Sequence, residues 1–168
     1  GQKVSQATKL VELADDFELW HTPDQLPYAT IKEGESVEHM RIGTSSSSGI
    51  KPFLSHRYYK MHGATPNASA LTDAVTLLIG RAKFDGPEHQ IYTRIAEIDD
   101  DQPTIYLDLA DADRNIVEVD EFGWSVIKDA PVRFVRPPGV ESLPLPSDGG
   151  SGDFTRLREL LNLGSDSD

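Results

Sequence analysis

The chain has 168 residues, 38% of them hydrophobic and 26% charged, which suits one globular domain with a small appendage and excludes a wholly disordered protein. No apolar run approaches the roughly 20 residues that span a bilayer. The absence of cysteine excludes disulfides and thiolate metal sites, and the net charge of −12 argues against nonspecific binding to nucleic acid.

Charge is distributed unevenly along the chain. Residues 39–72 contain no carboxylate but four Lys or Arg side chains, whereas residues 97–129 contain eleven carboxylates and only two Lys or Arg side chains. The chain is therefore electrically polarised, with a basic stretch that could meet a polyanion. The beginning of the sequence lacks the apolar region of a secretion signal, so we expect a cytoplasmic protein without a membrane partner.

In chain order, the first half is predicted to combine helices with a small sheet. Apolar residues at helical spacing predict a helix over residues 5–16. Alternating residues between turn signals predict an antiparallel meander over 17–42. A Gly- and Ser-rich loop at 43–49 then precedes a second helix over 50–62. The residues of this second helix that we expect to face inward are Ile50, Phe53, Leu54, Tyr58 and Met61.

The third predicted helix, residues 65–84, has the clearest start and stop signals. Thr65 can cap its N-terminus, and Pro66 suits the first helical position because the missing N–H has no partner there. Gly86 followed by Pro87 is a stop signal. Its apolar stripe consists of Leu71, Val75, Leu78, Ile79 and Ala82.

The second half is predicted to be a β unit. Five short strands separated by turn signals indicate an antiparallel sheet or half-barrel. They span residues 90–98, 104–109, 116–119, 123–127 and 132–135. A Pro- and Gly-rich stretch follows, and the apolar residues of 154–163 then share one helical face: Phe154, Leu157, Leu160 and Leu161.

These elements predict an α+β fold with three helices and two antiparallel β-meanders. We expect an α+β accessory domain over residues 1–137, a linker over 138–153, and the start of a truncated downstream domain over 154–168. The helices 50–62 and 65–84, followed by a β-hairpin, also make a winged-helix-like core an option.

The basic stretch supplies the candidate DNA-binding residues. Cations and aromatic rings on a helix after a flexible loop can grip phosphates and stack on bases. These candidates are Arg41, Lys51, His56, Arg57, Tyr59 and Lys60. The same pattern also fits a solvated helix face whose tyrosines belong to the core.

Asp108, Asp111 and Asp113 are the candidate metal ligands, because closely spaced carboxylates at a strand end can hold Mg²⁺. An ordinary polar hairpin turn explains the same residues. The sequence lacks both the phosphate-binding loop motif and the dinucleotide-binding glycine motif, so no cofactor is expected in this segment.

Several stretches together resemble one family. They are LVELADDFELWHTPDQLPYATI (10–31), SGIKPFLSHRYYKMHGATPNASALTDAVTLLIGRAKFDGPEH (48–89), TIYLDLADADRNIVEVDEFGWSVIKDAPVRFVRPPG (104–139) and LPLPSDGGSGDFTRLRELLNL (143–163). The chain resembles the region that precedes the P-loop ATPase in primase- or helicase-like proteins of phages, plasmids and integrated elements. The loop 43–49 is longer than the family pattern. The resemblance implies an accessory domain whose partners are DNA and the downstream ATPase domain, with oligomers formed through the parent protein.

Three functions follow as hypotheses. The first is a non-catalytic accessory domain of a mobile-element DNA replication helicase or primase, which positions DNA or the motor. The second is a protein–protein or oligomerisation scaffold that does not bind DNA. The third is a fragment of a metal-dependent nuclease or polymerase that uses the three aspartates.

Overall fold

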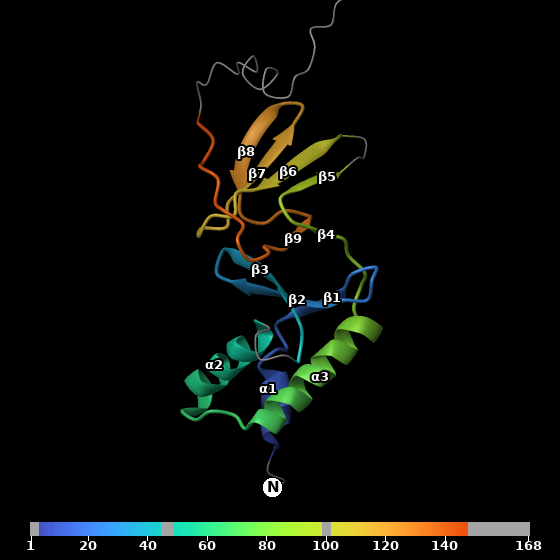
Figure 1. Ribbon diagram of the computed structural model, residues 1–168, viewed down its shortest axis with the longest axis vertical. Coiled ribbons are helices and arrows are strands. Elements are labelled where there is room, and N and C mark those ends of the chain that lie inside the picture. The colour runs from blue at the N-terminus through green and yellow to red at the C-terminus, as the bar shows by residue number, and fades with distance from the viewer. Residues whose placement is uncertain (1–3, 45–48, 99–101, 148–168) are drawn as a thin grey trace, which may run out of the picture.

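The computed structural model describes residues 4–44, 49–98 and 102–147, and its fold is α+β. Figure 1 shows an elongated molecule with three helices at one end, a small sheet in the middle and a larger sheet at the other end. We call residues 4–90 the helical half and residues 91–147 the β half. Within the described ranges, none of the helices is long and apolar enough to cross a membrane.

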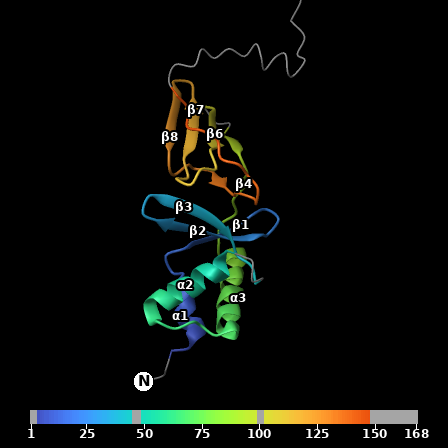
Figure 2. The same ribbon diagram turned by 60° about the vertical axis from the view of Figure 1, so that its left-hand side comes forward.

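The helical half packs its helices against a three-stranded sheet. The strands β1 (Glu18–His21), β2 (Pro27–Glu33) and β3 (Ser36–Arg41) form the expected antiparallel meander in that order. The helices are α1 (Gln6–Glu12), α2 (Ile50–His62) and α3 (Ala68–Phe84). They lie on one side of the sheet (Figure 2). The core between the two layers includes Leu10, Ile31, Ile42, Leu54 and Leu78, and each of these is at most 2% exposed.

Two helix boundaries differ from the sequence prediction. The first helix ends at Glu12 rather than residue 16, because the following residues form single turns that end with a bond from the Phe17 N–H to the Ala14 carbonyl. The cap of α3 is Asn67 and not Thr65, since the Asn67 side chain accepts the N–H of Ala70 at 2.7 Å.

The predicted inward face of α2 is only partly correct. Ile50, Leu54 and Tyr58 are buried and Phe53 packs against the core. Met61 is 68% exposed, so its prediction as a core residue is wrong. It lies in the last turn of the helix, which ends at the left-handed Gly63 (φ 66°).

Gly86 fixes how closely α3 approaches the sheet. A Cβ atom at this position would lie 2.6 Å from both the Leu19 and the Ala82 carbonyl oxygens. Only glycine fits there, because real Cβ atoms do not approach backbone that closely. The stop signal in the sequence is therefore also the contact point between α3 and β1.

The β half contains a four-stranded antiparallel sheet in chain order. Its strands are β5 (Ile95–Ile98), β6 (Thr104–Asp108), β7 (Ile116–Asp120) and β8 (Gly123–Ile127). The predicted strand 90–98 is divided in two: β4 (Ile91–Tyr92) pairs in parallel with β9 (Arg133–Phe134), and β5 joins the sheet. The expectation that 132–135 continues the meander is therefore wrong, because this segment leaves the sheet and pairs with β4 instead.

The hairpin of β5 and β6 does follow the helix pair, but β4 separates it from α3, so the winged-helix-like core remains a hypothesis. Residues 138–147 of the predicted linker contain no helix or strand, and they are hydrogen-bonded to the preceding part of the β half. The Leu143 N–H donates to the Leu109 carbonyl at 2.7 Å. The rest of the predicted linker and the segment 154–168 lie outside the described residues.

Candidate functional site

Arg133 of β9 is the centre of the junction between the two halves. Its guanidinium donates to Thr30 Oγ1 at 2.8 Å and to Glu18 Oε1 at 2.5 Å, and it lies over the ring of Trp20. The same group donates to His89 Nε2 at 3.0 Å. One side chain of the β half therefore binds two strands of the helical half and His89, near the end of that half.

The Thr30 hydroxyl fixes the protonation of His39. Its oxygen already accepts from Trp20 Nε1 and from Arg133, so its single hydrogen is donated to His39 Nδ1 at 2.9 Å. Neutral His39 therefore carries its proton on Nε2. Burial, followed by the positive charge of Arg133, lowers the pKa of His39 from 6.5 to about 4.

A groove opens beside this network, between β3 and the segment that follows β9. Its volume is about 660 Å³, and it extends from Glu38 along β3 to Gly49, directly before α2. The lining contains three arginines, Arg41, Arg114 and Arg136, and one carboxylate, Glu38. We call it the arginine groove.

Two of the three arginines are neutralised by ion pairs. Arg114 Nη2 lies 2.9 Å from Glu38 Oε1, and Arg136 forms a bidentate pair with Asp108. Arg41 is exposed and forms no ion pair with any residue in the described ranges. Arg41 therefore supplies the uncompensated positive charge of the groove.

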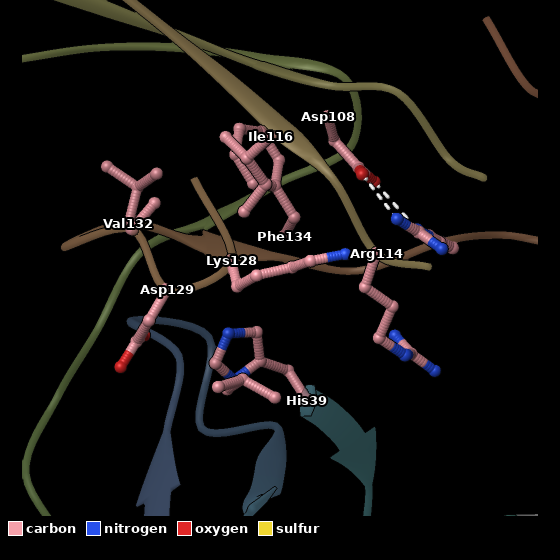
Figure 3. Close-up of a pocket in the computed structure, with 11 residues that line it drawn as sticks. His39, Asp108, Arg114, Ile116, Lys128, Asp129, Val132 and Phe134 are labelled. Carbon is pink, nitrogen blue, oxygen red and sulfur yellow. Dashed lines mark hydrogen bonds and ion pairs between the residues drawn. The ribbon is translucent and has the colours of Figure 1, made fainter. Parts of the chain in front are cut away.

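A smaller cavity of about 20 Å³ adjoins the groove, and Asp108 is one of the residues that line it. Figure 3 shows His39 facing Val132, Phe134 and Ile116 across this cavity, with the ion pair of Asp108 drawn as dashed lines. Asp108 is 1% exposed, and it accepts from Arg136 Nε at 2.8 Å and from Arg136 Nη2 at 2.6 Å. This carboxylate is fully paired with a cation of the chain.

The other two candidate metal ligands make local turn contacts. Burial by itself would raise the pKa of Asp111, but this carboxylate accepts the N–H and the side-chain amide of Asn115, and these bonds help to hold its pKa below the usual 3.8. Asp113 is exposed, and its backbone carbonyl accepts from Lys128 Nζ. In the part of the chain that the structure describes, no three His, Asp or Glu side chains are arranged to hold a metal ion. The geometry matches the hairpin-turn interpretation of these residues.

The six candidate DNA-binding residues do not form one surface. His56, Tyr59 and Lys60 are exposed on α2, and Arg41 lines the groove. Lys51 instead donates to Thr72 of α3 at 3.3 Å. Arg57 turns toward α1.

Arg57 holds the segment that follows α1, residues 13–17, against α2. It binds both carboxylate oxygens of Asp16, donates to the Leu13 carbonyl at 2.8 Å and lies over the rings of Phe17 and Phe53. The hydrogen bonds from Arg57 outweigh burial and lower the pKa of Asp16.

We therefore expect Arg57→Gln to lower the free energy of unfolding by about 1–2 kcal/mol, since it removes hydrogen bonds to a charged partner that is itself largely exposed. The matched variant Lys60→Gln, one turn away and exposed, should change it by less than about 0.5 kcal/mol. Urea denaturation of both variants measures the difference. Equal effects would contradict the structural role of Arg57.

Sequence reasoning missed the three arginines that organise the site, Arg114, Arg133 and Arg136. They lie in or beyond the acidic stretch, at least 42 residues past the end of the basic stretch at residue 72. Arg114 has a left-handed backbone (φ 56°), and Ala110 in the same loop does too (φ 54°). Only the three-dimensional arrangement brings Arg114 and Arg136 beside β3 and Arg133 to β1 and β2.

Comparison of the chain with family models, with curated proteins and with solved structures gave no match. The resemblance to the region before a P-loop ATPase therefore remains a hypothesis from the sequence.

Proposed function

We propose that this chain is a non-catalytic accessory domain of a DNA replication helicase or primase of a mobile element, and that it positions single-stranded DNA in the arginine groove. The observation that carries the proposal is Arg41, an exposed cation with no ion pair in the described ranges, in a groove lined by two further arginines. A groove of this kind suits an anionic chain, because phosphates are bound by arginine side chains and by backbone N–H groups.

The beginning of α2 adds to the positive electrostatic potential of the arginine groove. Gly49, which lines the groove, precedes the first turn of α2, and no side chain among the described residues caps the N-terminus of this helix. The helix dipole therefore places partial positive charge toward the groove, where backbone N–H groups can donate to an anion. Lys60, His56 and Tyr59 lie further along the same helix, where a strand leaving the groove could contact them.

The concave shape favours a single strand over a duplex. A protein that reads duplex DNA inserts a helix or a ribbon into the major groove. Here the cations line a depression between β3 and residues 133–138. A flexible single strand can enter such a depression, with its phosphates toward the arginines.

The proposal predicts that Arg41→Gln combined with Lys60→Gln weakens binding of a fluorescein-labelled oligothymidine severalfold at low salt. The slope of log affinity against log salt should decrease by about 0.7 for each phosphate that the variant no longer neutralises. Fluorescence anisotropy titrations at several salt concentrations give both quantities.

Arg81→Gln is the matched control, because Arg81 is a partly exposed cation on α3 outside the groove. It should leave the affinity and the slope unchanged. If the Arg41/Lys60 variant binds as tightly as the parent chain, or if Arg81→Gln weakens binding equally, the groove is not the binding site.

A further inference from the structure

The four-stranded sheet of the β half packs apolar residues of one face into a core and carries a second set of apolar residues on its other face. Its inner face contributes Ala96 and Tyr106 to a core that also includes Val132 and Phe134. The strand register places a second set of residues together on the opposite side, because directly paired residues share a face. We call this side the outer face, and its paired positions are Glu97 and the apolar residues Ile95, Ile105, Leu107, Val117, Val119, Trp124 and Val126.

Most of the outer face is open in the described part of the chain. Ile105, Val119 and Trp124 follow one another across three strands and are 43%, 38% and 44% exposed. Ile95 and Val126, at the two ends of the neighbouring row, are exposed at 61% and 39%, whereas Val117 between them is 5% exposed and already covered. A contiguous apolar surface of this kind marks a docking site, whereas single exposed apolar residues do not.

We propose that the outer face binds residues 154–163 of the same chain, FTRLRELLNL. The sequence of this segment predicts an amphipathic helix with the four apolar side chains Phe154, Leu157, Leu160 and Leu161 on one side. A helix of this type needs an apolar surface to cover its stripe, and a half-covered sheet needs a helix or a second sheet.

The end of the described chain lies within reach of this face. Residues 140–147 run beside the four-stranded sheet, held by the bond from Leu143 to Leu109 and by a bond from Arg94 to the Glu141 carbonyl (Figure 1). The orange-red part of the chain, which ends at residue 147, stops near the end of the sheet that is remote from the helices (Figures 1 and 2). Six residues separate Ser147 from Phe154, and six extended residues reach about 20 Å, which exceeds the length of a five-residue strand, about 17 Å.

Residues 154–163 also match the outer face in size and in charge. A helix of ten residues is about 15 Å long, and four strands spaced about 4.8 Å apart are about 14 Å wide. The outer face carries one charged strand residue, Glu97, and the adjoining hairpin contains Asp120 and Glu121. The segment contributes Arg156 and Arg158 against one carboxylate, Glu159, so docking would pair opposite charges.

Trp124 is a natural reporter for this contact. The only other tryptophan, Trp20, is 0% exposed, and its signal is obtained separately from the variant Trp124→Phe. In the full chain we expect acrylamide to quench Trp124 weakly. Leu157→Asp combined with Leu161→Asp should increase this quenching severalfold and shift the emission to longer wavelength, because water would reach the indole ring.

Asn162→Asp is the matched control, since it adds a carboxylate beside the apolar stripe rather than on it. It should leave the quenching unchanged. Equal quenching in the parent chain and the double variant would overturn the proposal. Protection of Trp124 from acrylamide that increases with protein concentration would also overturn it, because a second copy of the chain would then cover the outer face. The result is independent of DNA binding, which Arg41→Gln alters without touching this face.

Discussion

Replacing Arg136 by methionine is expected to lower the free energy of unfolding by about 3–5 kcal/mol, because it leaves a buried carboxylate without its partner. Asp108 is 1% exposed, and both of its oxygens accept from Arg136. A third bond, from Arg136 Nη1 to the Asp111 carbonyl at 2.6 Å, is removed as well. Urea denaturation of the full chain gives the change directly.

The matched control is Arg114→Met. Arg114 is also an arginine that lines the groove, but its partner Glu38 is 44% exposed at the side chain. Water can solvate that carboxylate after the substitution, so the decrease should stay below about 1 kcal/mol. The double variant Asp108→Asn with Arg136→Met should recover part of the stability, because the unpaired charge is then absent. A decrease below about 1 kcal/mol in Arg136→Met would contradict the structural role of Asp108.

The chain is expected to lose about 3 kcal/mol of stability as the pH falls from 6.5 to 4, because His39 is protonated readily only when the chain unfolds. The pKa of His39 is about 4 in the folded state against 6.5 in the unfolded state. Between these values the unfolded chain binds more protons than the folded chain, so stability decreases with decreasing pH. Protonated Nδ1 could no longer accept the Thr30 hydroxyl, and the added charge would face Arg133.

His39→Gln tests this assignment, since the glutamine carbonyl can accept from Thr30 but does not titrate. Its stability should vary much less between pH 7 and pH 4. Some dependence will remain, because burial and Arg133 also lower the pKa of His89. Asp16 has little effect on stability between pH 6.5 and 4. Its pKa lies below 3.8, so its contribution to stability is lost only at lower pH. An unchanged pH profile in His39→Gln would show that another group is responsible.

Helices and strands that have local sequence signals are predicted more accurately than the pairing of one element with another. The helix over 50–62 and the three-stranded meander are confirmed, because apolar periodicity and turn residues act within each segment. The N-cap of α3 was misplaced by two residues, since Thr65 and Asn67 are both good caps and Asn67 is also held in place by Gln6, whose side chain accepts its N–H at 3.0 Å. The parallel pairing of β4 with β9 joins segments about 40 residues apart, and no local pattern indicates it.

The candidate site was predicted even less completely, because it depends on pairing between distant residues. Arg41 was identified from the basic stretch and does line the groove. Arg57 belongs to the same stretch but binds the segment that follows α1, since Asp16 and two aromatic rings lie beside it in space. Arg136 and Asp108 are 28 residues apart. A sequence alone cannot show that a carboxylate at a strand end forms an ion pair with an arginine so far along the chain.

Anisotropy titration of the full chain with labelled single-stranded, duplex and forked DNA at increasing salt tests the central proposal most directly. The account predicts binding to the single strand and to the fork at low salt, weaker binding to the duplex, and a log affinity that falls linearly with log salt. No binding at low salt, or binding that does not respond to salt, would contradict the proposal. The chain would then be better described as a scaffold that binds proteins and not DNA.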